Sequence, residues 1–225
     1  MIIIGTYHKT GTFLFREIWK TINKLLKLKI NYKFLLNFYM ATDEEIKNNK
    51  CIILIRNPYE IICSGYRYHK IANETWLNKK PIQKSFILEN KDYGEDKSYK
   101  DVINSFENED DKIMFELRNA AYNTIYNIYN DIKNRNFNNN ILIIKLEDLY
   151  NKNNIETICK KIINHIGLNR RLDKFIKGFN KNLNKNFHRT NNKNTYTYPE
   201  LFKKHHYEEF NKLYPDDILE IMDYK

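Results

Sequence analysis

The residues between Gly5 and Thr12 are of the types that hold phosphate groups. They lie between an apolar run and a helical pattern, and they read Gly5-Thr6-Tyr7-His8-Lys9-Thr10-Gly11-Thr12. The backbone amides of such a turn, and of the helix N-terminus that follows it, attract anions. Lys9 adds a mobile cationic donor, and the threonine hydroxyls add further donors. The sequence therefore predicts a phosphate-binding loop, with a glycine-bearing turn and a solvated lysine as the simpler alternative.

The position of the lysine separates this loop from that of the common nucleotide triphosphatases. The Walker A loop has a glycine, four further residues, and then Gly-Lys followed by Ser or Thr. Here Lys9 stands before Gly11 rather than after it. An ordinary nucleotide triphosphatase is therefore disfavoured.

A second polar group lies at a later predicted turn. Arg56 follows the apolar run at 51–55, and Ser64 lies further along the same segment. Asn57 suits a helix N-cap and Pro58 the first helical position, so the chain passes directly from strand into helix. Arg56 is thereby placed at the carboxyl end of a strand, where open α/β sheets bind their ligands.

Together these two motifs resemble those of the sulfotransferases that use 3′-phosphoadenosine 5′-phosphosulfate (PAPS) as donor. Residues 9–12 match the family's Pro-Lys-Ser/Thr-Gly-Thr loop in register, with His8 in place of the proline. Arg56 and Ser64 match the family's arginine and serine that bind the 3′-phosphate. Arg189 matches, more weakly, a late basic residue that covers this phosphate. The resemblance implies that the donor is bound by His8, Lys9, Thr10, Gly11, Thr12, Phe13, Arg56, Ser64 and Arg189.

The resemblance also implies a reaction. A sulfuryl group passes in line from PAPS to a hydroxyl or amine of a small-molecule or carbohydrate acceptor, which leaves adenosine 3′,5′-bisphosphate (PAP). We expect Lys9 to stabilise the charge on the leaving phosphate, without a metal ion. The catalytic base is left open between His69, whose simpler interpretation is an exposed helix histidine, and Asp43, whose simpler interpretation is helix capping. The segment 146–149 resembles the family's Tyr-Glu-Asp-Leu/Met segment.

The elements that must position these residues follow from the apolar pattern. Apolar runs at 2–4, 34–39, 51–55 and 141–145 predict strands, and the stripes at 14–26, 114–132 and 155–166 predict helices. Thr42 and Glu45 have the spacing of a capping box that opens a further short helix. Buried strands that alternate with helices predict an α/β fold with three layers, a central parallel sheet and helices on both faces. The resemblance makes this a P-loop nucleotide-binding type.

Length and composition are those of one soluble domain. The 225 residues are 42% hydrophobic, and no apolar run is long enough for a membrane span or a signal peptide. We therefore expect a cytoplasmic protein with a single domain at 1–225. Within it, 73–111 is an insertion or lid and 180–198 a loop that covers the nucleotide. The three cysteines form no Cys-x-x-Cys pair, which predicts buried, reduced thiols.

The charge leaves two other functions open. The net charge is +10, and the stretch 160–193 is rich in lysine and arginine with Asp173 as its one acid. This excess of positive charge attracts anions, but it does not indicate which anion the protein binds. A basic face that is only solvated would show the same excess. The alternatives are a P-loop kinase of nucleotides or small molecules and a non-catalytic module that binds polyanions or RNA. As a sulfotransferase, the protein is expected to have no nucleic-acid partner.

Overall fold

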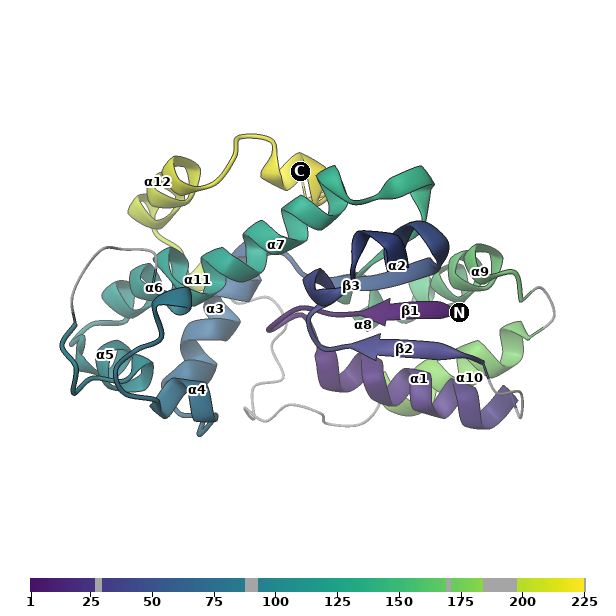
Figure 1. Ribbon diagram of the computed structural model, residues 1–225, viewed down its shortest axis with the longest axis horizontal. Helices are drawn as coiled ribbons and strands as arrows, with labels where there is room; N and C mark the ends of the chain where they lie inside the picture. The colour runs from purple at the N-terminus through teal and green to yellow at the C-terminus, as the bar shows by residue number, and fades with distance from the viewer. Residues whose placement is uncertain (27–29, 88–92, 169–170, 184–197, 225) are drawn as a thin grey trace. The chain divides into compact units, whose positions relative to one another are not determined.

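The computed structural model describes residues 1–26, 30–87, 93–168, 171–183 and 198–224, which group into two compact units (Figure 1). Unit 1 comprises Met1–Asn57 and Asn130–Asn191, and unit 2 comprises Pro58–Tyr129 and Asn192–Lys225. Two compact units can belong to one folding domain. The expectation of a single domain therefore stays a prediction.

The described part of unit 1 contains a four-stranded parallel sheet with the strand order β2-β1-β3-β4. Its strands are β1 (Ile2–Gly5), β2 (Tyr32–Leu35), β3 (Lys50–Ile55) and β4 (Ile141–Lys145). In register, Ile4 pairs with Phe34 on one side and with Ile52 on the other. These findings confirm an α/β fold with a parallel sheet. The run at 34–39 is only partly a strand, because β2 ends at Leu35 and a 3-10 helix (Phe38–Met40) follows.

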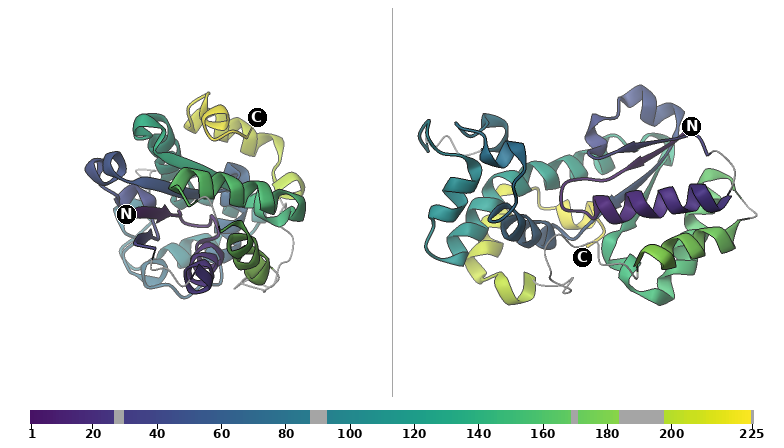
Figure 2. Two further views of the ribbon diagram at one scale, coloured as in Figure 1. Left: turned by 90° about the vertical axis from the view of Figure 1, so that its right-hand side faces the viewer. Right: turned by 90° about the horizontal axis from the view of Figure 1, so that it is seen from below.

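Both faces of this sheet are covered. In β3, Ile52 and Leu54 belong to a core cluster shared with four helices, α1 (Thr12–Leu26), α8 (Leu146–Tyr150), α9 (Ile155–Ile166) and α10 (Leu172–Leu183). Ile53 and Ile55 are fully buried too, although alternate residues of a strand point to opposite faces. Figure 2 shows α1 and α10 side by side, and Figure 1 shows α2 (Asp43–Asn48) on the other side of the strands.

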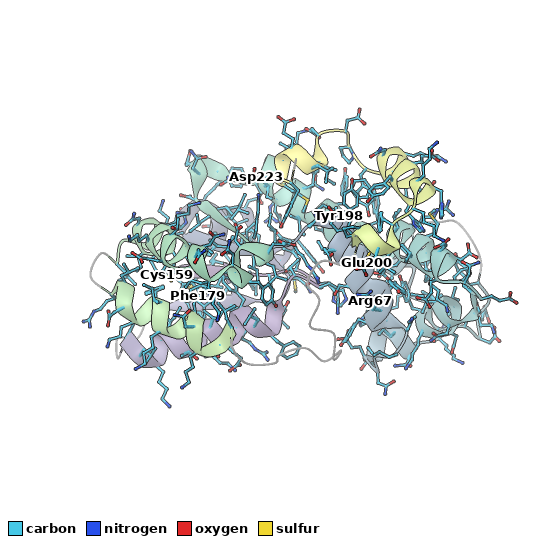
Figure 3. The ribbon with its side chains drawn as sticks, turned by 180° about the vertical axis from the view of Figure 1, so that it is seen from behind. Arg67, Cys159, Phe179, Tyr198, Glu200 and Asp223 are labelled. Atoms are coloured by element: carbon cyan, nitrogen blue, oxygen red, sulfur yellow. The ribbon has the colours of Figure 1, made fainter. Side chains whose placement is uncertain are left out.

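The three cysteines are buried, as expected, two of them in unit 1 and Cys63 in unit 2. Cys159 of α9 and Phe179 of α10 both belong to the core cluster and are labelled in Figure 3. Cys51, Cys63 and Cys159 are buried and form no disulfide. Burial raises the pKa of the Cys51 and Cys159 thiols to about 12, which keeps both protonated.

The loop predicted at 180–198 is wrong at both of its ends. Helix α10 continues to Leu183, because Asn182 is buried and its side-chain amide donates to Thr21 Oγ1 (2.9 Å) and to the Gly178 carbonyl (2.8 Å). Tyr198 already begins helix α11. The remainder of the predicted loop, which includes Arg189, lies outside the described residues.

In the described residues of unit 2, the regular secondary structure consists of helices joined by turns and loops. Its helices are α3 (Pro58–His69), α4 (Thr75–Asn78), a 3-10 helix (Lys84–Phe86), α5 (Tyr99–Ser105), α6 (Glu109–Arg118), most of α7 (Ala120–Asn134), α11 (Tyr198–Leu201), α12 (Lys204–Leu213) and α13 (Ile218–Ile221). In the stretch 73–111, Leu77, Tyr99 and Ile103 are fully buried. That stretch therefore contributes to the core of unit 2, and its role as an insertion or lid stays a prediction.

The single long helix predicted over 114–132 is wrong, because the chain breaks it into α6 and α7. The break is at Asn119, whose φ of −125° and ψ of −103° are not helical. The buried Asn119 side chain donates to the Phe115 carbonyl at 2.8 Å. Such a local side-chain bond competes with the helical backbone pattern, and an apolar stripe alone does not reveal it.

None of the helices in the described ranges is long and apolar enough to cross a membrane.

Candidate functional site

Three strand-end turns lie next to one another in unit 1. Strands β1, β3 and β4 are neighbours and parallel, so their carboxyl ends at Gly5, Ile55 and Lys145 share one edge of the sheet. The phosphate-loop candidate follows β1, and Arg56 follows β3. Helix α8 (Leu146–Tyr150) follows β4. The sheet thus brings together two motifs that lie far apart in the sequence.

The turn after β1 is closed by bonds to the backbone of one residue, Tyr7. The Thr10 hydroxyl accepts a hydrogen bond from the Tyr7 amide (2.9 Å) and donates to the Tyr7 carbonyl (2.9 Å). The Thr10 amide and the Thr12 hydroxyl also donate to that carbonyl, at 3.2 Å each. Lys9 has a φ of 64°, a left-handed conformation that costs a non-glycine residue on the order of 1 kcal/mol. The surrounding bonds hold Lys9 in it.

Glycine is required at both ends of this loop. Gly11 has a φ of 93°, and a Cβ added there would lie 2.8 Å from Cδ1 of Leu146. A Cβ added at Gly5 would collide with the Phe38 side chain. Leu146 and Phe38 are both buried, so neither has room to move away. The loop backbone is therefore packed directly against the turn after β4 and the segment after β2.

The hydroxyls of the loop are used within the protein in this structure. Thr6 Oγ1 donates to Thr12 Oγ1 (3.0 Å) and lies 3.1 Å from the Leu36 carbonyl oxygen, and Thr10 is fully buried. The start of α1 follows this loop directly, and the first amides of a helix lack intrahelical acceptors. No acidic side chain stands in the first turn of α1. Ligand contacts by Thr10 and Thr12 stay predictions.

The side chain of Arg56 contacts the backbone of Lys9. Arg56 Nη1 donates to the backbone carbonyl of Lys9 at 3.3 Å, and both residues are half-buried. Arg56 also lies near Tyr150: burial raises the pKa of that phenol, and the positive charge of Arg56 partly opposes the rise. Arg56 and the Lys9 peptide therefore belong to one positively charged corner at the carboxyl edge of the sheet.

Glu147 is a residue of this corner whose role the sequence analysis missed. Its Oε1 accepts a hydrogen bond from the Asn57 amide at 2.9 Å, across 90 positions of sequence. The bond ties the turn after β4 to the turn that carries Arg56. The Glu-Asp pair in the segment 146–149 was the available signal, but the type of residue alone did not specify its partner.

The remaining predicted donor-binding residues are placed as follows. His8 is half-buried in the loop, and Phe13 is 42% exposed with the Arg16 guanidinium 4.9 Å from its ring centroid. Ser64 is half-buried on α3, in unit 2. Arg189 lies outside the described residues. The roles of all four stay predictions.

The two candidates for the catalytic base differ in access. Asp43 begins α2, its side chain is 59% exposed, and its Oδ1 accepts from Arg135 Nε at 2.8 Å. The capping box beside it is confirmed, but Thr42 and Glu45 form it rather than Asp43. His69 is fully buried, and its Nδ1 lies 2.7 Å from Oε2 of Glu116. It is therefore not an exposed helix histidine. Of the two candidates, Asp43 is the one that is exposed to solvent.

The described residues contain no cluster of three or more His, Cys, Asp or Glu side chains that would hold a metal ion. In comparisons with known proteins, no family model matches the chain, and no curated protein does. What is known of its class is therefore the α/β fold with a parallel sheet and the polar corner at the carboxyl edge of that sheet.

Proposed function

We propose that the protein transfers a sulfuryl group from PAPS to a hydroxyl or amine of a small-molecule or carbohydrate acceptor. The observation that carries the proposal is the contact between Arg56 and the Lys9 peptide at the carboxyl edge of the sheet. The sequence assigns these residues to opposite ends of one donor, Lys9 to its phosphosulfate and Arg56 to its 3′-phosphate. A donor with anionic groups at both ends needs two cationic turns that lie close together.

The chemistry asked of the chain is positioning and charge stabilisation. The bond between sulfur and the bridging phosphate oxygen breaks, and a bond forms from sulfur to the acceptor oxygen or nitrogen. Negative charge grows on the leaving phosphate, where the Lys9 ammonium and the amides at the start of α1 stabilise it. The acceptor proton passes to a base, for which Asp43 is favoured over His69 because its carboxylate is exposed.

The proposal is tested by comparing the binding of PAP, which has a 3′-phosphate, with the binding of AMP, which lacks it. We expect the protein to bind PAP, and Arg56→Ala and Ser64→Ala to weaken PAP binding roughly 10- to 100-fold, the effect of losing a charged hydrogen bond. AMP has no 3′-phosphate, so its affinity should change by less than about 3-fold. Isothermal titration of both nucleotides measures this difference, and thermal unfolding verifies that each variant is folded.

Lys160→Ala is the matched control. This variant removes the positive charge of an exposed lysine on α9, which forms an exposed ion pair with Glu156. Lys160 is the first residue of the basic stretch at 160–193. If this control weakens PAP as much as Arg56→Ala does, binding is general attraction between charges, and the polyanion-binding alternative is favoured. Equal losses for PAP and AMP in Arg56→Ala would overturn the assignment of the 3′-phosphate. Binding that needs ATP and Mg²⁺ would favour the kinase.

A further inference from the structure

A buried carboxylate reaches the phosphate loop from the C-terminal end of α7. Asp131 is 1% exposed. Its Oδ2 accepts a hydrogen bond from the Tyr7 hydroxyl at 2.7 Å, and its Oδ1 accepts from Arg135 Nη1 at 2.6 Å. Buried charges persist in proteins when they are paired in this way. Asp131 therefore links Tyr7 of the loop, 124 positions earlier in the chain, to Arg135, which lies one residue beyond the C-terminal end of α7.

Arg135 continues this chain of contacts to the segment after β2. Its Nε donates to Asp43 Oδ1 at 2.8 Å, its Nη1 to the Tyr39 carbonyl at 3.3 Å, and its Nη2 to the Ala41 carbonyl. A planar guanidinium makes several directed bonds at once, which a lysine ammonium does not reproduce. Arg135 thus couples Asp131 to the segment that carries Asp43.

Tyr7 is the point through which these contacts act on the loop. The Thr10 and Thr12 side chains and the Thr10 amide all bond to the Tyr7 peptide. The Tyr7 ring packs edge-on against Phe38, with centroids 6.3 Å apart, and Phe38 covers Gly5. The position of the Tyr7 side chain therefore sets the position of the peptide around which the loop closes.

We propose that Tyr7, Asp131 and Arg135 form a positioning relay, which holds the loop in the conformation that binds the donor's phosphosulfate and couples it to Asp43. This inference rests on the proposed function. None of the three residues needs to touch the donor. Tyr7 and Asp131 are both buried. Burial raises the pKa of both groups, and the positive charge of the Arg135 guanidinium partly lowers it again. A bond lost there is consequently not replaced by water.

The test removes one oxygen atom. Tyr7→Phe deletes the hydroxyl that binds Asp131 and keeps the ring that packs against Phe38. We expect PAP affinity to fall roughly 10-fold, about one hydrogen bond to a charged group. Amide hydrogen exchange should become faster within residues 8–12. Arg135→Lys keeps the charge but loses the branched contacts, so it should produce the same two changes to a smaller extent. It also provides the measurement if Tyr7→Phe does not fold.

Tyr129→Phe is the matched control. Tyr129 lies on α7, the helix that carries Asp131, and its hydroxyl donates to Asp217 Oδ1 at 2.9 Å. Tyr129→Phe therefore loses a bond between a tyrosine hydroxyl and a carboxylate, as Tyr7→Phe does, but outside the loop. We expect a similar loss of thermal stability, PAP affinity within about 2-fold of the wild type and unchanged exchange at 8–12. If Tyr7→Phe behaves like this control, the relay is wrong. If the wild type binds no PAP, the proposed function fails, whereas faster exchange at 8–12 in Tyr7→Phe would still support the relay's hold on the loop.

Discussion

Each unit of the molecule contains a buried carboxylate that accepts a hydrogen bond from a tyrosine, but the two clusters differ in the residues to which they connect. In unit 1, Asp131 binds Tyr7, and Tyr7 leads to the half-buried loop residues His8 and Lys9. In unit 2, Glu116 accepts from the Tyr99 hydroxyl at 3.0 Å and lies 2.7 Å from His69 Nδ1. The Tyr99–Glu116–His69 group is at most 1% exposed at every member.

The difference between the clusters teaches that burial and polar contacts alone do not identify a functional site. The group around Glu116 is closed in by aromatic rings, with Trp76 5.0 Å and Tyr99 5.5 Å from the His69 ring. Gly65 passes so close that a Cβ there would collide with Glu116. A network of this kind specifies packing. The Asp131 network instead ends at the turn that carries Lys9 and contacts Arg56.

The largest expected effect is the loss of stability in unit 2. Glu116→Ala leaves His69 and Tyr99 without their acceptor, and each unsatisfied buried group costs about 1 to 3 kcal/mol. We expect the free energy of unfolding to fall by roughly 2 to 6 kcal/mol, measured by urea denaturation. Glu17→Ala, which breaks an exposed ion pair with Lys20, should cost no more than about 1 kcal/mol. A Glu116→Gln variant of normal stability that had lost sulfuryl transfer would show that this cluster is catalytic.

The next effect concerns the chemistry in unit 1. Lys9→Ala should lower the rate of sulfuryl transfer about 10²- to 10³-fold, because one preorganised donor to the leaving phosphate is lost. The fold should remain, since the bonds that close the turn join Tyr7 to Thr10 and Thr12. The rate is measured with radiolabelled PAPS and a panel of hydroxyl and amine acceptors. Lys20→Ala, a change at an exposed lysine of α1, serves as the control. Undiminished transfer in Lys9→Ala would remove Lys9 from the mechanism.

The smallest effect separates backbone strain from packing at the loop. Gly11→Ala and Gly167→Ala both place a side chain at a positive φ, 93° and 72° respectively. Only at Gly11 does the added Cβ meet a neighbour, whereas nothing lies within 4 Å at Gly167. We expect about 1 kcal/mol of destabilisation for Gly167→Ala and a further 1 to 3 kcal/mol, roughly, for Gly11→Ala. Equal losses in thermal unfolding would mean that Leu146 yields and does not hold the loop.

Much of the local structure in the two units was predictable because the signals act over a few residues. The capping box of Thr42 and Glu45, the start of α3 at Pro58, and β4 at Ile141–Lys145 all agree with the sequence patterns. Where prediction was wrong, a buried polar side chain overrode the pattern. Asn119 breaks a continuous apolar stripe, and Asn182 extends a helix into a polar stretch. Neither asparagine reveals its burial in the sequence.

In the candidate site, too, local features were predictable from the sequence, whereas contacts between distant residues were not. Residue types and spacing were enough to predict the turn after β1 and the turn that carries Arg56, because each depends on neighbours within one strand-to-helix connection. Phosphate binding by these turns stays a prediction. Strand order and packing brought Arg56 to the Lys9 peptide, Glu147 to Asn57, and Asp131 to Tyr7. These contacts join residues 47, 90 and 124 positions apart. Their geometry depends on how a twisted parallel sheet and its helices bury apolar surface together, which no local pattern encodes.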